Sequence, residues 1–126
     1  MTSLRMPLSL FDNAWLDEIP DSEIEAQAIS KGDGIKGRAH VVSTGSGQRR
    51  IGRYGWKAHI ATLEEMVADA FATELGVITP LAAASLTVAP PIEADDDVVL
   101  AVTSYLRSLA GVDAMRRRTR MPEPRR

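Results

Sequence analysis

The segment 62–76, TLEEMVADAFATELG, carries the clearest secondary-structure signal in the chain. Thr62 with Glu65 after it forms a capping box, a pattern that starts helices. Gly76 supplies the helix end. Between them, apolar residues recur every three or four positions, at Leu63, Met66, Val67, Ala70, Phe71 and Leu75. The pattern predicts an amphipathic helix that buries one face in a core.

Glu74 lies inside this apolar stripe. On a wheel with about 100° per residue it falls about 20° from Leu63, so the pattern directs its carboxylate at the core. A buried carboxylate must pair, remain protonated with a raised pKa, or line a polar cavity. The last two states suit proton transfer, so Glu74 is a candidate catalytic residue. In the alternative, the last helical turn frays and Glu74 faces solvent.

Two short helices are expected before this segment. Pro20 should end the first, and Asp21 or Ser22 can cap the second, which runs into the loop 31–34. The first helix, over residues 8–19, is predicted from apolar residues at helical spacing, which are Leu8, Phe11, Trp15, Leu16 and Ile19. It should press this apolar face on the core.

A β-hairpin is expected over residues 37–54. The loop 43–47, STGSG, separates two short apolar runs, which are Ala39, Val41 and Val42 before it and Ile51 and Tyr54 after it. This loop is longer than a tight two-residue turn, so the sequence leaves the strand register open.

After Gly76 we expect one loop and one helix. Residues 77–94 carry three prolines and little periodicity, which predicts a connecting loop. The three aspartates at 95–97 favour a helix start. Gly111 should end this helix. Its predicted buried face consists of Val98, Val102, Tyr105, Leu106 and Leu109.

The composition fits a single globular domain, and the expected elements make this domain mainly α-helical with one small hairpin. The chain has 126 residues, of which 44% are hydrophobic and 25% charged. It contains no cysteine, which excludes disulfides, thiolate metal sites, thiol nucleophiles and the C-x-x-C-H motif that attaches c-type haem. We find no apolar run near the roughly 18 residues of a membrane span. Residues 1–11 also lack the apolar core of a signal peptide.

The net charge of −2 conceals a basic C-terminus. Residues 116–126 hold six arginines and one glutamate, so residues 1–115 are acidic. Charge and proline content predict that residues 112–126 form a disordered basic tail. The alternative is nucleic-acid binding by this tail, which the lack of interleaved aromatic side chains disfavours.

His40 and His59 are the two histidines of the chain and the candidate ligands for a metal or a haem. Neither has another ligand at a metal-site spacing, so the alternative is a hydrogen-bonded or solvated side chain, and we predict no metal site. Trp56 lies in GRYGWKA at 52–58, where it can anchor local packing or carry electrons. The residues alone leave these roles open.

Several blocks of sequence occur in an order that is similar to a known family. They are LDEIPD at 16–21, GDGIKGR at 32–38, GRYGWKA at 52–58, ATLEE at 61–65, LG at 75–76 and SYLRSLA at 104–110. Taken together, most of residues 5–110 resembles the di-haem oxidoreductase family, also called thiol oxidoreductases. This family is related to the bacterial di-haem cytochrome c peroxidases.

The resemblance implies a cytochrome c-like helical fold, a periplasmic location and, in the parent family, two covalently attached haems c. It assigns Trp56 to electron relay between the haems and Glu74 to proton transfer at the peroxide site. Met66 departs from the pattern, because the family often has Gln after the Leu-Glu-Glu triplet. This departure removes a polar group that peroxide chemistry would use.

Neither haem-attachment motif is present, since each needs cysteine. We therefore expect residues 1–111 to be a haem-free inter-haem segment of a truncated or split gene product, with no cofactor and no catalysis of its own. The expected partner is a haem-bearing polypeptide or an electron-donor protein. In the alternative, the chain is a non-catalytic interaction module that docks its acidic surface on a separate cytochrome.

Overall fold

The computed structural model describes residues 10, 13–28, 34, 36–88 and 90–118, with side chains described as far as residue 109. In this part of the chain the helical elements are α1 (Asn13–Glu18), α2 (Asp21–Ala26), α3 (Leu63–Ala70), the π-helical turn η1 (Phe71–Leu75), α4 (Pro80–Ala83) and α5 (Asp96–Arg118). The strands β1 (Val41–Ser43) and β2 (Arg49–Ile51) pair as an antiparallel hairpin. The expectation of a mainly α-helical chain with one small hairpin is confirmed.

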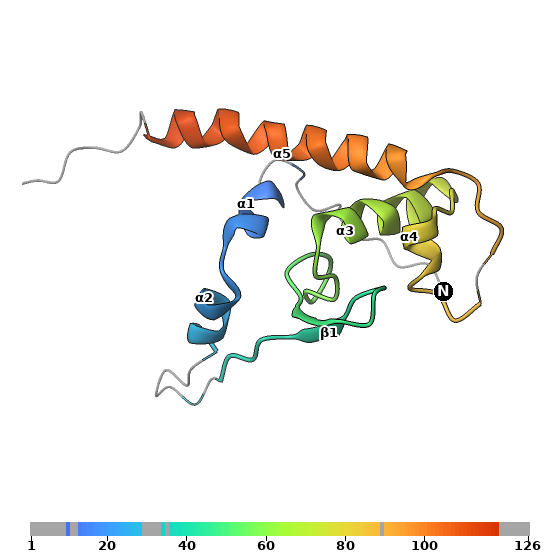
Figure 1. Ribbon diagram of the computed structural model, residues 1–126. Coiled ribbons are helices and arrows are strands. Elements are labelled where there is room, and N and C mark those ends of the chain that lie inside the picture. The colour runs from blue at the N-terminus through green and yellow to red at the C-terminus, as the bar shows by residue number, and fades with distance from the viewer. Residues whose placement is uncertain (1–9, 11–12, 29–33, 35, 89, 119–126) are drawn as a thin grey trace, which may run out of the picture.

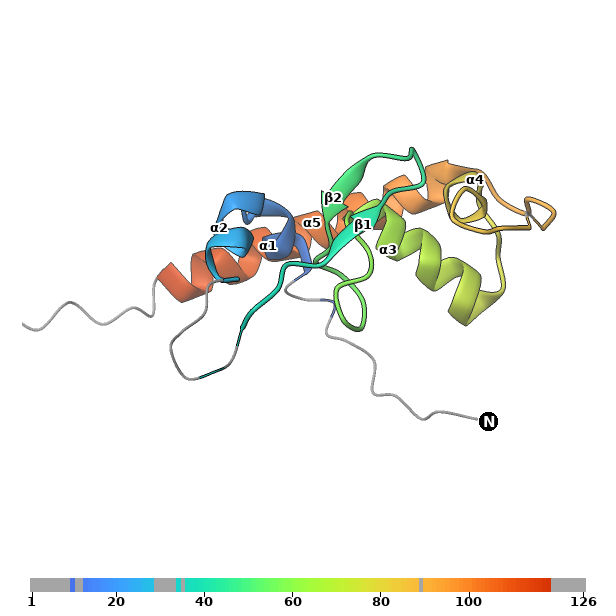
Figure 2. The same cartoon turned by 90° about the horizontal axis from the view of Figure 1, so that it is seen from below.

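The long helix α5 organises the fold (Figure 1). Both α1 and α3 pack against it, while the hairpin lies below α3 in this view, away from α5. Seen from below, the hairpin, α1 and α2 lie in front of α5 (Figure 2). The core between these elements is small and mostly aliphatic: Tyr54, Ile60, Leu63, Val67, Ala68, Ala82, Val99 and Leu106. Within the described residues, no helix has both the length and the apolar character needed to cross a membrane.

Helix α3 begins as the sequence predicts. Its N-cap is Thr62, whose hydroxyl accepts a 3.2 Å hydrogen bond from the backbone N–H of Glu65. The Glu65 carboxylate accepts a 3.1 Å bond from the backbone N–H of Gly45, so it ties the helix to the hairpin loop. The helix then widens into η1 and ends at Gly76, which has a left-handed φ of 69°.

The hairpin has the register that the sequence left open. Val42 lies opposite Arg50, with Val41 opposite Ile51 on one side and Ser43 opposite Arg49 on the other. Its turn is closed by the Thr44 N–H, 2.9 Å from the Gln48 carbonyl oxygen, and by the Gly47 N–H, 2.8 Å from the Thr44 carbonyl oxygen. Backbone contacts within the loop therefore fix the register.

The first two helices differ from the prediction at their ends. Helix α1 starts at Asn13, and the predicted residues 8, 9, 11 and 12 before it lie outside the described residues, as do 31–33 of the predicted loop. Pro20 is the N-cap of α2, so the prediction of Asp21 or Ser22 as the cap is wrong. The extended ψ of 144° at Pro20 lets its carbonyl accept the first helical bond without a capping side chain.

The prediction of a plain loop over residues 77–94 is also wrong, because α4 lies within it. Thr79 is the N-cap, and its hydroxyl accepts a 3.3 Å bond from the backbone N–H of Ala82. Pro80 occupies the first helical turn, where its missing N–H costs nothing. Proline therefore starts a helix here rather than breaking one.

Two predictions about α5 need correction. The helix continues past Gly111 to Arg118, through residues 112–118 that were assigned to the tail, while 119–126 lie outside the described residues. The core-facing side chains Val99, Thr103 and Leu106 are at most 4% exposed, whereas Val98, Val102 and Tyr105 are 40%, 37% and 62% exposed. Leu106 and the partly buried Leu109 were predicted correctly. The helix has two neighbouring apolar stripes, and contact with α1 and α3 selects the one that is buried.

Candidate functional site

A tight loop at residues 52–60 links the hairpin to α3. Tyr54 and Ile60 pair as an isolated antiparallel bridge, with N–H to carbonyl oxygen distances of 2.9 and 3.2 Å. Between them, Lys57 and Ala58 have left-handed φ angles of 65° and 51°, which residues with side chains rarely adopt. The bridge holds this strained turn in place.

Two glycines make the turn sterically possible. A Cβ atom on Gly52 would lie 2.0 Å from the Ala58 carbonyl oxygen. A Cβ atom on Gly55, where φ is 72°, would lie 2.4 Å from Cε1 of His59. The glycines of GRYGWKA therefore allow the loop to fold closely on itself.

Backbone carbonyls of this loop contact the side chains of both histidines, His59 within the loop and His40 before β1. His40 Nδ1 lies 3.0 Å from the Lys57 carbonyl oxygen, and His59 Nδ1 lies 2.9 Å from the Trp56 carbonyl oxygen. A carbonyl only accepts, so in the neutral ring each Nδ1 carries the proton and each Nε2 remains an acceptor or ligand atom. Both side chains are exposed. Over the described residues, however, no cluster of three or more His, Cys, Asp or Glu could hold a metal ion.

A cavity of about 230 Å³ lies between the hairpin, α3 with η1, and α4. Its polar wall consists of Ser43, His59, Glu65, Asp69, Thr73 and Ser85. Its apolar wall consists of Val42, Ile60, Ala61, Ala72, Leu81, Ala82 and Leu86. Of the four candidate residues from the sequence, His59 lines this cavity, while His40, Trp56 and Glu74 do not. The structure thus separates the candidates rather than assembling them.

The charge of this cavity comes from α3. Glu65 and Asp69 lie one helical turn apart, on the same side as Ala72 and Thr73. No ion pair joins either carboxylate to a lysine or arginine of the described residues. Negative charge beside an apolar wall favours a cationic or hydrogen-bond-donating small molecule over an anion. The sequence did not identify Glu65 and Asp69 as cavity residues, although their spacing of four was a usable signal.

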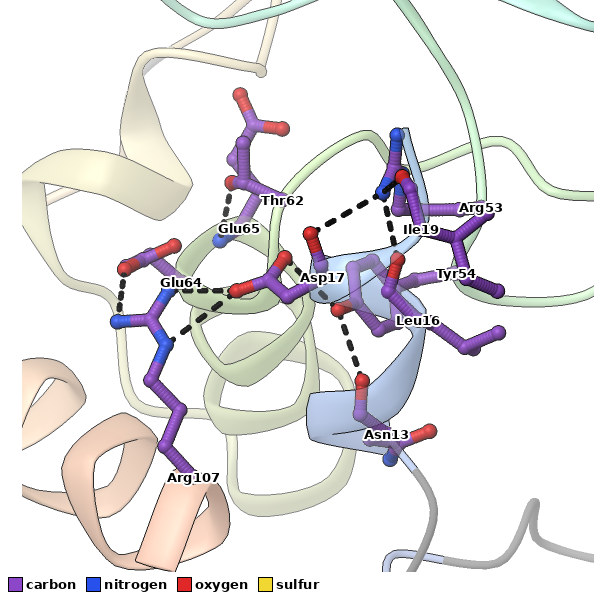
Figure 3. A network of polar contacts seen from close by, with 10 residues as sticks. All are labelled: Asn13, Leu16, Asp17, Ile19, Arg53, Tyr54, Thr62, Glu64, Glu65 and Arg107. Carbon is purple, nitrogen blue, oxygen red and sulfur yellow. Dashed lines mark hydrogen bonds and ion pairs between the residues drawn. The ribbon is translucent and has the colours of Figure 1, made fainter. Parts of the chain in front are cut away.

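A polar network on another side of α3 joins α1, the loop, α3 and α5 (Figure 3). The Arg53 side chain is 9% exposed, and its Nη1 donates to the carbonyl oxygens of Leu16 at 2.5 Å and Ile19 at 2.8 Å. Its Nη2 pairs with the Asp21 carboxylate. The guanidinium therefore satisfies carbonyls in the last turn of α1 and just after its end, which helical N–H groups do not reach.

Asp17 lies at the centre of this network (Figure 3). Its Oδ2 accepts bonds from Nη2 and Nε of Arg107 at 2.7 and 3.3 Å. The Tyr54 hydroxyl lies 2.9 Å from Asp17 Oδ1 and 2.9 Å from the Asn13 carbonyl oxygen. Nη1 of Arg107 pairs with Glu64 at 2.8 Å. Four segments of the chain are thus held by one set of contacts.

These contacts oppose proton release within the network. Burial raises the pKa of the Tyr54 phenol above its ordinary value of 10.0, and the hydrogen bond to Asp17 raises it further. The hydrogen bonds to Asp17 and Glu64 raise the pKa of Arg107. Tyr54 therefore stays protonated and Arg107 stays charged, which suits a structural role.

Of the two positions that the sequence left open for Glu74, the structure shows the solvent-facing one, and the inward one is wrong. Glu74 is exposed, as is Ala70 one turn before it, while Leu63, Val67 and Ala68 are buried. The buried face is therefore centred to one side of Leu63. Phe71 and Ala72 at the start of η1 still pack against the core, while the end of η1, residues 73–75, is exposed. Trp56 is 47% exposed and lies in the loop rather than in the core.

The described residues do not fit a haem. The chain has no cysteine for covalent attachment. His59 lines a cavity of about 230 Å³, which is smaller than the roughly 300–1,000 Å³ of ordinary ligand pockets. A porphyrin could not enter it without rearrangement of the hairpin or α4.

Comparison of the chain with protein-family models, with curated proteins and with solved structures gives no match.

Proposed function

We propose that this chain is a non-catalytic, haem-free segment of the di-haem oxidoreductase type, and that it contributes to electron transfer only when docked against a haem-bearing polypeptide. The finer fold assignment, a cytochrome c-like helical fragment, and the periplasmic location belong to the same proposal. Its support comes from where the resembling blocks lie in the fold.

Four of these blocks meet in the polar network, although their members lie up to 90 residues apart in the chain. A chance resemblance of separate short segments gives no reason for such convergence. This meeting of the blocks is the observation that carries the proposal. The contributing residues are Asp17 from 16–21, Arg53 and Tyr54 from 52–58, Glu64 from 61–65, and Arg107 from 104–110.

The network supplies position rather than chemistry. Its carboxylates are paired with guanidinium groups, and its phenol is held protonated. Glu74 and the two histidines are exposed and do not join it. The chain therefore offers a folded support for the Trp56 loop, and haem chemistry must come from another polypeptide.

A second candidate is a module that docks on a separate, basic cytochrome. The cavity favours it, because Glu65 and Asp69 form no ion pair with the arginines or lysines of the described residues. Unpaired surface carboxylates steer a basic partner toward the face that carries them.

The test begins with the purified full chain. We expect no Soret band after haemin is added and no peroxide consumption with a reduced electron donor. Peroxide turnover by the chain alone would overturn the proposal.

Docking is then measured by titrating the chain with a basic c-type cytochrome and following tryptophan fluorescence, which haem quenches at short range. Quenching should fall in Trp56→Phe, while the partly buried Trp15 reports any general effect. Glu65→Gln with Asp69→Asn separates the two candidates, because it weakens binding only if the cavity carboxylates steer the partner. Equal quenching in Trp56→Phe and the wild type contradicts docking at the loop.

A further inference from the structure

Positive charge is concentrated in the hairpin and in the segments on either side of it. Residues 34–63 contain six lysines and arginines and no aspartate or glutamate, whereas residues 64–109 contain eight acidic residues and one arginine. Of the six cations, Arg53 is nearly buried and pairs with Asp21. The other five form a basic surface, since they are exposed and have no ion pair with a carboxylate of the described residues: Lys36, Arg38, Arg49, Arg50 and Lys57.

Strand pairing brings part of this basic surface beside the loop 52–60. The Gly52 N–H donates a 2.7 Å bond to the His40 carbonyl oxygen, so the antiparallel pairing of β1 and β2 extends to these two residues. Because side chains alternate along a strand, His40 and Arg50 share one face of the hairpin. His40 Nδ1 lies 3.0 Å from the Lys57 carbonyl oxygen. The backbone of Lys57 therefore lies on the same side of the hairpin as Arg50.

An exposed aromatic residue accompanies these cations. Trp56 is 47% exposed and directly precedes Lys57, whereas Tyr54 is buried. Exposed aromatic side chains beside basic ones stack on the bases of single-stranded nucleic acids, with little preference for sequence. The arginines of residues 116–126 have no aromatic residue among them. The hairpin and its loop thus have the combination that the basic C-terminus lacks.

The composition of the basic surface favours a nucleic acid over an acidic protein as the partner. Interfaces between proteins have a centre from which charged residues are depleted. Here five exposed cations accompany two exposed large apolar residues, Val41 and Trp56. Interfaces with nucleic acids are much more positively charged. Arginine supplies three of the five cations, and its planar group matches phosphate with two parallel hydrogen bonds.

We propose that this chain binds single-stranded nucleic acid along the hairpin and the loop 52–60. Phosphates pair with the basic surface, and a base stacks on Trp56. The acidic helices repel the strand, which keeps it on the side of the hairpin that lies away from α5 (Figure 1). This binding needs no haem-bearing polypeptide, so its test succeeds or fails independently of the proposed function.

Titration of a labelled thymidylate strand of about 12 nucleotides with the full chain, followed by fluorescence anisotropy, tests the proposal. At about 50 mM salt we expect a dissociation constant of about 1–10 µM. Its logarithm should rise with the logarithm of the salt concentration with a slope of about 3, as for four or five neutralised phosphates. Absence of binding at this salt concentration would overturn the proposal.

The contribution of charge is tested by neutralising two cations of the basic surface. Arg50→Gln with Lys57→Gln should raise the dissociation constant about tenfold and lower the salt slope by about one. Arg116→Gln with Arg117→Gln is the matched control, because it removes the same charge outside the hairpin, and it should raise the constant less than about threefold. An equal or larger effect of the control would place the site in the basic C-terminus and overturn the proposal.

The contribution of stacking is tested at Trp56. Trp56→Ala should raise the dissociation constant about tenfold and leave the salt slope unchanged, because it removes a stacking partner but no charge. Trp56→Phe should restore most of the affinity, since a phenyl ring also stacks on a base. Circular dichroism verifies that each variant remains folded, as expected for exposed side chains. Wild-type affinity in Trp56→Ala would contradict stacking and overturn the proposal.

Poly-aspartate distinguishes a nucleic acid from an acidic polypeptide, because it carries the negative charge without bases. As a competitor of the labelled strand it should bind at least about tenfold more weakly than unlabelled thymidylate of the same charge. Equal competition by the two polymers would show that the basic surface recognises acidic chains in general, and the proposal would then be wrong.

Discussion

Glu64 and Glu65 are neighbours in the sequence but face two different regions. The carboxylates of the polar network are ion-paired, whereas those that line the cavity are not paired with a lysine or arginine of the described residues. Glu64 joins the network, in which Asp17 and Glu64 pair with Arg107 (Figure 3). In the same network Asp21 pairs with Arg53. Glu65 faces the cavity, where it bonds the backbone of the hairpin loop. The network therefore holds elements together, while the cavity leaves charge available to a ligand.

The two regions also differ in how strongly their charges should affect stability. The Arg53 side chain is nearly buried. If it is removed, the carbonyl groups that it contacts lose their donor and cannot bond to water instead. Arg107 and the cavity carboxylates are more exposed, and solvent screens their interactions. Mutations should therefore rank by burial rather than by the number of ion pairs.

The largest effect is expected for Arg53→Met. It leaves the Leu16 and Ile19 carbonyls without their donor and should lower the free energy of unfolding by about 3 kcal/mol. Urea denaturation followed by circular dichroism measures the change. Arg50→Met is the control, because Arg50 is exposed on β2 and should change stability by less than about 0.5 kcal/mol. Similar losses in both variants would show that the network does not stabilise the fold.

Tyr54→Phe should have the next largest effect. It removes the hydroxyl that bonds Asn13 and Asp17 and should lower the free energy of unfolding by about 1–2 kcal/mol. Tyr105→Phe removes an equivalent hydroxyl from a side chain that is 62% exposed and should have almost no effect. A neutral Tyr54→Phe would mean that packing alone fixes this ring.

Because the pKa of Tyr54 is raised, Tyr54→Phe and Tyr105→Phe should also differ in how their stability depends on pH. Below pH 10.0 the phenol is protonated in the folded and unfolded chains, so it contributes no slope. Above that pH the unfolded chain releases the proton first, and the free energy of unfolding falls as pH rises. Denaturation at a series of pH values should show a shallower decline for Tyr54→Phe than for Tyr105→Phe. Parallel curves would contradict a buried, protonated phenol.

A smaller effect is expected on α3. Glu64→Gln weakens the partly exposed pair with Arg107 and should cost at most about 1 kcal/mol, with a smaller loss at high salt. Asp69→Asn should leave stability unchanged or raise it by a few tenths of a kcal/mol, because it relieves repulsion from Glu65. Thermal denaturation compares the two variants. A larger loss of stability in Asp69→Asn than in Glu64→Gln would show that the cavity carboxylates also stabilise the fold.

The smallest effect is expected for Glu74→Gln. Since Glu74 is exposed, the free energy of unfolding of this variant in urea denaturation should stay within about 0.5 kcal/mol of the wild type. A change of more than about 1 kcal/mol would instead indicate the buried carboxylate that the helical wheel predicts.

Local patterns were sufficient for most of the elements. The Thr62 cap, the Gly76 end and the hairpin were predicted because each depends on neighbouring residues. Helix α4 was not predicted, because the three prolines of residues 77–94 indicated a loop. Thr79 before Pro80 is nevertheless a signal for the start of a helix. For the site, the sequence identified His59, but not its grouping with Glu65 and Asp69, because the cavity brings together three separate elements.

Residue order alone determined the helical periods, the caps and the lack of any thiol to hold a covalent haem, because these properties are local or compositional. Tertiary contact decided which of two apolar stripes on α5 is buried, that Glu74 faces solvent, and that Arg53 satisfies the end of α1. A helical wheel gives the angles between side chains, but the neighbouring elements decide which angle faces the core.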